Sequence, residues 1–193
     1  MPFPTTRPRR LRRSELLRTL TRETRLSPSD FIYPLFVCPG AGVQREIGSM
    51  PGNYHFSVDR VGEECRAVAE LGIPAVLLFG IPETKDERGS GAYGDQSIVA
   101  QAVRAIRKAV GEKLLIACDV CLCEYTSHGH CGLIKDGDVD NDATLELLAE
   151  AAVSYACAGA DIVAPSDMMD GRVRAIRAAL DGASLRQTAI LAY

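Results

Sequence analysis

The sequence contains no tryptophan, and its aromatic residues are limited to five phenylalanines and six tyrosines among 193 residues. It also lacks any apolar run near the roughly 18 residues that a transmembrane helix needs. The N-terminus has no apolar segment of the kind that a secretory signal requires. We therefore expect a cytosolic protein with no membrane partner.

The net charge is only −3, but it is unevenly distributed. Residues 1–25 contain eight arginines and two glutamates, a balance of +6, which leaves −9 for the remainder. Such a basic arm is typical of a solvated tail, of an arm that binds nucleic acid, or of an arm that packs on a neighbouring subunit. The acidic body and the few aromatic residues argue against nucleic acid as a partner.

Short apolar runs alternate with segments of helical spacing along the rest of the chain. The predicted strands are Ile32–Val37, Ala75–Phe79, Leu114–Val120, Asp161–Ala164 and Ala189–Tyr193. The predicted helices are Val58–Leu71, Gln96–Val110, Ala143–Ala158 and Gly171–Leu180. This alternation predicts an α/β fold with a parallel sheet, either doubly wound or closed as a barrel.

No G-x-G-x-x-G follows the first strand, which weakens the dinucleotide-binding form of the open sheet. A barrel needs about 250 residues, whereas this chain supplies four strands and the beginning of a fifth. We therefore expect a truncated chain, with a basic arm at 1–25 and an incomplete (β/α) barrel domain at 26–193.

Three of the seven cysteines crowd into positions 121–131, which in a reducing compartment indicates metal binding or catalysis rather than disulfides. Alternation along the third strand would place Asp119, Cys121 and Cys123 on one face, and Cys131 returns after a turn. Three soft ligands favour zinc. The fourth position is either open, as in catalytic sites, or closed by His128 or His130. Packing of the cysteines as small buried side chains explains the spacing poorly.

Other polar residues admit both functional and structural interpretations. Ser166 and Asp167 follow the fourth strand, where substrate contacts and helix caps are equally expected. The glycines and charges of Lys85–Gly91 suit either a mobile active-site loop or plain surface. Four acids between 136 and 142 fail the EF-hand pattern, and a hairpin-like loop with Asp142 as the helix N-cap explains them.

The segment DVCLCEYTSHGHCG (119–132) closely resembles the zinc-dependent type of the porphobilinogen synthase family, also called 5-aminolevulinate dehydratase. The resemblance extends to TKDERGS (84–90), VDNDATLE (139–146) and AGADIVAPSDMMDGRV (158–173). It implies a (β/α)8 TIM barrel with an extended N-terminal arm, of which this chain holds the arm and about the first half of the barrel.

The family condenses two molecules of 5-aminolevulinate to porphobilinogen with loss of two waters, a hydro-lyase step of haem synthesis. By resemblance, Cys121, Cys123 and Cys131 ligate a catalytic Zn2+ that acts as a Lewis acid. Asp119 and Ser166 match positions that line the active site, with Asp119 a candidate for proton transfer. Family members are homo-octamers in which the arm wraps a neighbouring barrel.

The resemblance also implies that this chain lacks some of the family's functional residues. The two lysines that form Schiff bases in the family, and the ligand of its allosteric Mg2+, have no counterpart among these residues. We therefore expect metal binding but no catalysis by this chain alone. The alternatives are a non-catalytic fragment that binds zinc or joins oligomers, and a thiol-based metal or redox sensor.

Overall fold

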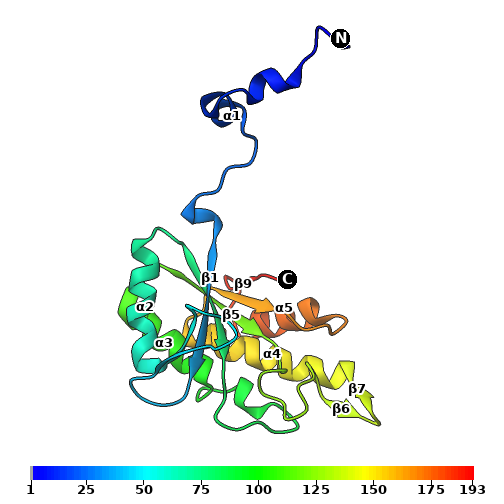
Figure 1. Cartoon of the computed structure of the whole chain (residues 1–193). Helices are drawn as coiled ribbons and strands as arrows, with labels where there is room; N and C mark the ends of the chain where they lie inside the picture. Colours follow the sequence, from blue (N-terminus) through cyan, green and yellow to red (C-terminus); the bar gives the residue numbers. More distant parts are fainter. Residues whose placement is uncertain (1) are drawn as a thin grey trace.

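A computed structural model describes residues 2–193 and shows an α/β fold built on one seven-stranded sheet (Figure 1). The strands are β1 (Ile32–Cys38), β2 (Gln44–Glu46), β3 (Tyr54–Ser57), β4 (Ala75–Gly80), β5 (Leu115–Val120), β6 (Ile134–Lys135), β7 (Asp138–Val139), β8 (Ile162–Pro165) and β9 (Ala189–Ile190). The helices are α1 (Glu15–Thr21), α2 (Val58–Glu70), α3 (Ile98–Val110), α4 (Asn141–Ala158) and α5 (Arg172–Gly182), with short 3-10 helices η1 (Pro8–Arg12), η2 (Pro28–Asp30) and η3 (Ser90–Ala92).

The strand order is β2-β3-β1-β4-β5-β8-β9, in which β1, β4, β5, β8 and β9 are parallel and follow one another in chain order. One helix connects each pair of neighbours from β1 onward, and α2 packs on α3, α3 on α4, and α4 on α5. A doubly wound sheet reverses its order at a switch point, whereas consecutive right-handed crossovers place every helix on the same face. The order is therefore that of a (β/α) barrel wall.

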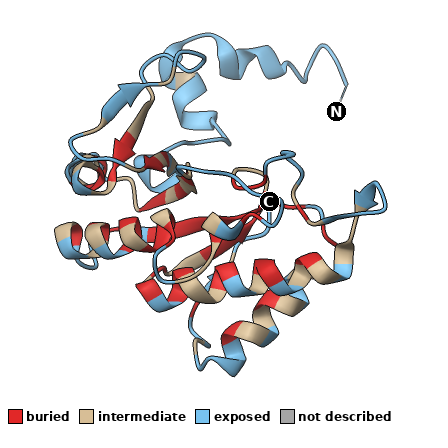
Figure 2. Cartoon of the chain, turned by 90° about the horizontal axis from the view of Figure 1, so that it is seen from below, coloured by how far each residue is buried: buried red, intermediate tan, exposed pale blue. Residues whose placement is uncertain are grey.

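The two faces of this sheet differ in what covers them. Leu35, Leu78, Cys118 and Val163 lie in register across β1, β4, β5 and β8 and belong to the core that the helices bury. Buried residues accordingly concentrate in the strands and the adjoining helix faces (Figure 2). Alternate residues face the opposite side, where Leu115 remains 46% exposed. Asp119 also projects from this second face.

The predicted strands are all present, although β9 is shorter than Ala189–Tyr193. The antiparallel pair β2–β3, which extends the sheet beyond β1, was not predicted because Tyr54–Ser57 contains no apolar run. The hairpin-like acidic loop is the antiparallel pair β6–β7. The predicted N-cap Asp142 is wrong: Asp140 accepts a hydrogen bond from the Ala143 amide and caps α4, and Asp142 lies in its first turn.

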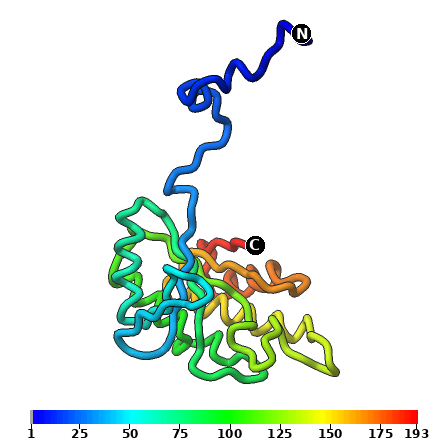
Figure 3. The backbone as a smooth tube through the Cα atoms, viewed as in Figure 1, coloured from blue at the N-terminus to red at the C-terminus, as the bar shows by residue number. Residues whose placement is uncertain are grey.

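The N-terminal segment contributes no residue to the buried core of the described chain. None of residues 2–32 is buried, and the segment leads away from the sheet (Figures 1 and 3). It is nevertheless ordered locally, since the Ser14 hydroxyl accepts from the Leu17 amide and caps α1. The arm boundary at residue 25 stays a prediction. Across residues 2–193, none of the helices has the length and apolar character to cross a membrane.

Candidate metal centre

Three thiols meet just beyond the carboxyl end of β5. The sulfur atoms of Cys121, Cys123 and Cys131 all lie within 4.8 Å of one another. The Sγ atoms of Cys121 and Cys123 are 3.4 Å apart. Cys121 is buried and the other two cysteines are half-buried. The three cysteines that the sequence singled out are thus brought together in a group that can hold a metal ion.

The reason for this meeting differs from the one that the sequence suggested. An extended strand would separate Cys121 and Cys123 by about 6.6 Å, two residues at roughly 3.3 Å each. Strand β5 ends at Val120, however, so both cysteines lie in the turn that follows it. The backbone N–H groups of Tyr125 and Thr126 each donate to the Leu122 carbonyl at 2.9 Å. This turn, rather than strand alternation, brings the two thiols together.

Neither histidine of the loop enters the thiol cluster. His128 accepts a hydrogen bond through Nδ1 from the backbone N–H of His130, at 3.1 Å. Its Nε2 lies 3.3 Å from the Glu87 carbonyl oxygen. Both imidazoles are exposed, and their ring centroids lie 5.5 Å apart. The donor set that the fold assembles therefore consists of sulfur alone.

The surroundings keep two of these thiols protonated when no cation is present. The pKa of Cys123 is raised, first by its contact with the Cys121 thiol and then by burial and the Glu124 carboxylate. Burial likewise raises the pKa of Cys131. A bound cation acts in the opposite direction, because it stabilises the thiolate form of a ligating cysteine. Metal binding would thus release protons from this site.

Asp119 lies on the face of β5 opposite to the helices and is only 5% exposed. Tyr193 donates its hydroxyl to Asp119 Oδ1 at 2.8 Å, and the Ser166 hydroxyl is a second partner. Burial outweighs these hydrogen bonds and raises the pKa of Asp119 to about 6. The structure therefore unites the two predicted site residues, Asp119 and Ser166, and adds Tyr193. Nothing in the sequence pattern marked Tyr193, because it follows a run of apolar residues.

Asp167 has a structural role, which was one of the two interpretations of its position after β8. Its Oδ1 accepts the backbone N–H of Met169 at 2.7 Å and shapes the turn that precedes α5. Its Oδ2 lies 3.5 Å from Arg172 Nε and makes no hydrogen bond. Burial raises the pKa of Asp167. Its charge also acts on Asp119 and Cys131, so the three groups share one electrostatic environment.

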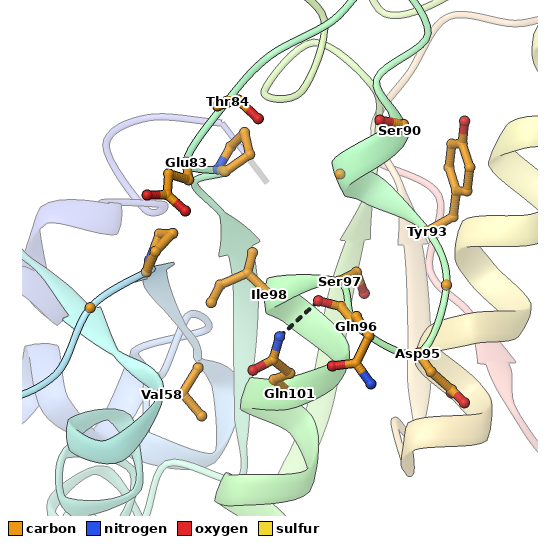
Figure 4. Close-up of a pocket in the computed structure, with 15 residues that line it drawn as sticks. Val58, Glu83, Thr84, Ser90, Tyr93, Asp95, Gln96, Ser97, Ile98 and Gln101 are labelled. Atoms are coloured by element: carbon orange, nitrogen blue, oxygen red, sulfur yellow. Dashed lines mark hydrogen bonds between the residues drawn. The ribbon is translucent and has the colours of Figure 1, made fainter.

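A cavity of about 620 Å3 lies elsewhere, between the loop after β1 and the connection from β4 to α3. Its lining includes Glu83, Tyr93, Gln96 and Gln101, and the Gln101 side chain donates to the Gln96 carbonyl at 2.7 Å (Figure 4). None of the predicted site residues lines this cavity. The chemistry predicted from the sequence is therefore concentrated at the thiol cluster and Asp119.

The parallel strands follow one another in chain order, and polar groups gather at the carboxyl edge of the sheet. Proteins of the (β/α) barrel class carry their active sites at this edge. Comparison with known proteins narrows the class. The family model for delta-aminolevulinic acid dehydratase matches residues 5–193. The chain belongs to this family.

Individual relatives agree with the family match. The delta-aminolevulinic acid dehydratase of Synechococcus elongatus is 56% identical over 99% of this chain. That of Ruminiclostridium josui is 48% identical over 97% of this chain, which covers 91% of that protein. The Toxoplasma gondii enzyme, whose crystal structure contains the reaction product porphobilinogen, superposes with a TM-score of 0.92 at 38% identity.

The chain does not span the full length of most of these relatives. The structural match to the Toxoplasma gondii enzyme includes 97% of this chain but only 54% of the Toxoplasma gondii chain. The sequence match to the Synechococcus elongatus protein covers 60% of that protein. The matched part is an α/β parallel sheet that corresponds to about half of the TIM-barrel structure.

Proposed function

We propose that this chain carries the metal-binding part of a porphobilinogen synthase, which condenses two 5-aminolevulinate molecules with loss of two waters. The observation that carries the proposal is the cluster of Cys121, Cys123 and Cys131 at the carboxyl edge of the sheet, in a member of this family. Three thiols at one point have little structural use in a chain whose cysteines form no disulfide among the described residues.

Zinc is the proposed metal, since thiolate donors select it over the hard cations. Thiolates bound at about 2.3 Å in a tetrahedral arrangement lie about 3.8 Å apart. The sulfur separations here, 3.4 Å for one pair and within 4.8 Å for all three, fit that arrangement after small rotamer adjustments. Three protein ligands leave the fourth position for water or substrate, and the bound zinc supplies Lewis-acid chemistry.

Asp119 is the proposed proton-transfer residue. Its pKa of about 6 makes both protonation states accessible near neutral pH, as a group that alternately takes and returns a proton requires. The hydroxyls of Tyr193 and Ser166 contact this carboxylate and hold it in place. Ser166 is half-buried, so its hydroxyl is also placed to contact substrate.

Schiff-base formation is the step for which these residues supply no candidate. The sequence contains four lysines, Lys85, Lys108, Lys113 and Lys135, and none of them lies in the seven-stranded sheet. We therefore expect residues 1–193 alone to form no porphobilinogen from 5-aminolevulinate. A colorimetric pyrrole assay measures this directly, and detectable turnover contradicts our assignment of roles.

The exposed arm and the reduced thiols extend the proposal. We infer that residues 1–25 form a separate arm that packs on a second subunit, since apolar side chains such as Leu16 (83% exposed) and Leu20 (76% exposed) are uncovered. A homo-octamer is the assembly that the family resemblance implies. A cytosolic location is part of the same proposal, because free thiols persist in a reducing compartment.

Metal binding tests the proposed site. We expect one Zn2+ per chain and, with Co2+ as a probe, the intense thiolate-to-metal absorption of a sulfur-rich site. The Cys131→Ser variant should lose most of that absorption, whereas Cys157→Ser, which alters an exposed cysteine outside the cluster, should keep it. Equal binding by both variants removes the metal assignment. A zinc-free chain that instead cycles reversibly to a Cys121–Cys123 disulfide favours a redox sensor.

A further inference from the structure

The cysteine loop (residues 121–131) is joined to a second loop, the connection from β4 to α3. The backbone N–H of Asp86 donates to the Tyr125 carbonyl at 3.3 Å, and the Ser127 N–H donates to the Asp86 carbonyl at 2.9 Å. Asp86 and Thr126 thereby form an isolated parallel bridge outside the main sheet. The two loops follow the neighbouring strands β4 and β5, so this bridge joins them at the carboxyl edge of the sheet.

The side chain of Asp86 holds its own loop in the conformation that forms this bridge. Its Oδ1 accepts the backbone N–H groups of Arg88 at 2.8 Å and Ser90 at 3.1 Å, and the Ser90 hydroxyl bonds to Oδ2. Gly89 adopts φ +62° and closes the turn, and a Cβ there would lie 3.3 Å from Thr126 Cγ2. The charged loop is thus largely exposed, but its backbone is bonded to the cysteine loop at Asp86.

Thr126 connects this bridge to both ends of the thiol cluster. Its backbone N–H donates to the Leu122 carbonyl, between Cys121 and Cys123. Its side-chain hydroxyl donates to the His130 carbonyl at 2.8 Å, directly before Cys131. The residue is only 1% exposed, so this orientation is enforced by packing. Through its backbone and its side chain together, this one residue links the turn that carries the first two cysteines to the residue before the third.

We propose that Thr126 is a positioning residue for the metal site, held in place by the Asp86 bridge, and this inference rests on the metal binding proposed above. Its hydroxyl closes the loop that carries Cys131 back to Cys121 and Cys123. A flexible loop would have to lose conformational entropy each time it bound an ion. The Thr126–His130 hydrogen bond removes much of that loss in advance, as groups that orient metal ligands do in other sites.

A matched pair of substitutions tests the hydroxyl. Thr126→Val keeps the shape of the side chain but removes its hydrogen-bond donor, and Thr126→Ser keeps the donor. We expect about tenfold weaker Co2+ and Zn2+ binding for Thr126→Val, the low end of the effect of removing a group that orients a metal ligand. Its thiolate-to-Co2+ absorption at saturation should also shift, because the third sulfur is less well placed. Thr126→Ser should restore both properties.

A control separates this role from general stability. Ser154→Ala removes another hydroxyl, the one that accepts the Gly94 amide at 2.9 Å and ties the same connection to α4. We expect that variant to bind metal with unchanged affinity and spectrum. If Thr126→Val does not fold, Asp86→Ala takes its place, with Asp86→Asn as the rescuing variant, since Asp86 is exposed and lies outside the core. Unchanged affinity and spectrum in the folded test variant overturn the proposal.

Amide hydrogen exchange distinguishes failure of this inference from failure of the metal assignment. Without metal, the Ser127 amide should exchange more slowly than its exposure suggests, and Asp86→Ala should accelerate it at least several-fold. A wild-type chain that binds no metal but shows this coupling refutes the metal site and leaves the loop bridge intact. Exchange that does not respond to Asp86→Ala refutes the bridge itself, whatever the metal affinity.

Discussion

The buried carboxylate of Asp119 should lower the stability of the protein at neutral relative to acidic pH, and Asp119→Asn should remove that contribution. The pKa of Asp119 is raised by burial from 3.8 to about 6, so the folded state binds this proton more tightly than the unfolded state does. As pH rises, the unfolded chain releases the proton first. Stability therefore falls between about pH 4 and pH 6 and stays lower above that range.

The expected size of the effect follows from the shift. A rise of roughly two pKa units corresponds to about 3 kcal/mol of destabilisation when the carboxylate is fully ionised. No large discount for solvent screening applies, since Asp119 is 5% exposed. In Asp119→Asn, the side-chain carbonyl can still accept from Tyr193, while the ionisable proton is gone. The variant should match the wild type near pH 4 and exceed its stability by up to about 3 kcal/mol at pH 7.5.

Urea denaturation of both proteins at the two pH values, with chelator present to exclude metal, measures this difference. Asp136→Asn is the control for replacing an exposed acid outside the site, in the turn between β6 and β7. The reasoning is refuted if Asp119→Asn and the wild type differ by the same amount at pH 4 and pH 7.5. It is also refuted if the variant is the less stable protein at pH 7.5.

Two further substitutions test packing, one at the carboxyl end of β4 and one at the opposite end of the sheet, where β5 and β8 begin. A Cβ on Gly80 would overlap the Tyr125 hydroxyl and lie 2.7 Å from Val99 Cγ2, so Gly80→Ala should lower the free energy of unfolding by about 1–3 kcal/mol, whereas Gly48→Ala, with open space around it, should be tolerated. Arg107 donates to Asp161 at 2.6 Å and to the carbonyls of Gly159 and Gly111, so Arg107→Ala should lower stability by about 2 kcal/mol. Arg104→Ala, which breaks a more exposed pair with Asp95, should cost about 0.5 kcal/mol. Chemical denaturation decides each comparison, and equal losses in test and control variants contradict the assigned contacts.

The strands that could be predicted from the sequence are those whose own residues are apolar and therefore become buried. Apolar runs such as Ala75–Gly80 and Leu115–Val120 become central parallel strands because both of their faces are partly covered. Strand β3 escaped prediction because its four residues, Tyr54–Ser57, owe their conformation to pairing with β1 rather than to an apolar pattern. Tertiary pairing of this kind is not visible in local sequence.

The site shows the same division between local and tertiary information. The identity of the three cysteines could be predicted from their chemistry and from the family resemblance, and they do meet. The geometry could not, since the turn after Val120 depends on hydrogen bonds to Leu122 rather than on strand alternation. The bridge between Asp86 and Thr126 joins two polar loops distant in sequence, and no periodic pattern marks either partner.

The sequential order of β1, β4, β5, β8 and β9 has a consequence for how the protein is made. Each of these strands pairs with the one synthesised before it, after a single helix has been added. In a doubly wound order, by contrast, the strand after the switch point pairs with the first strand rather than with the one made just before it. The sheet can therefore grow on the ribosome one strand at a time. The cysteine loop emerges directly after β5, when its partner loop from β4 is already in place to receive it.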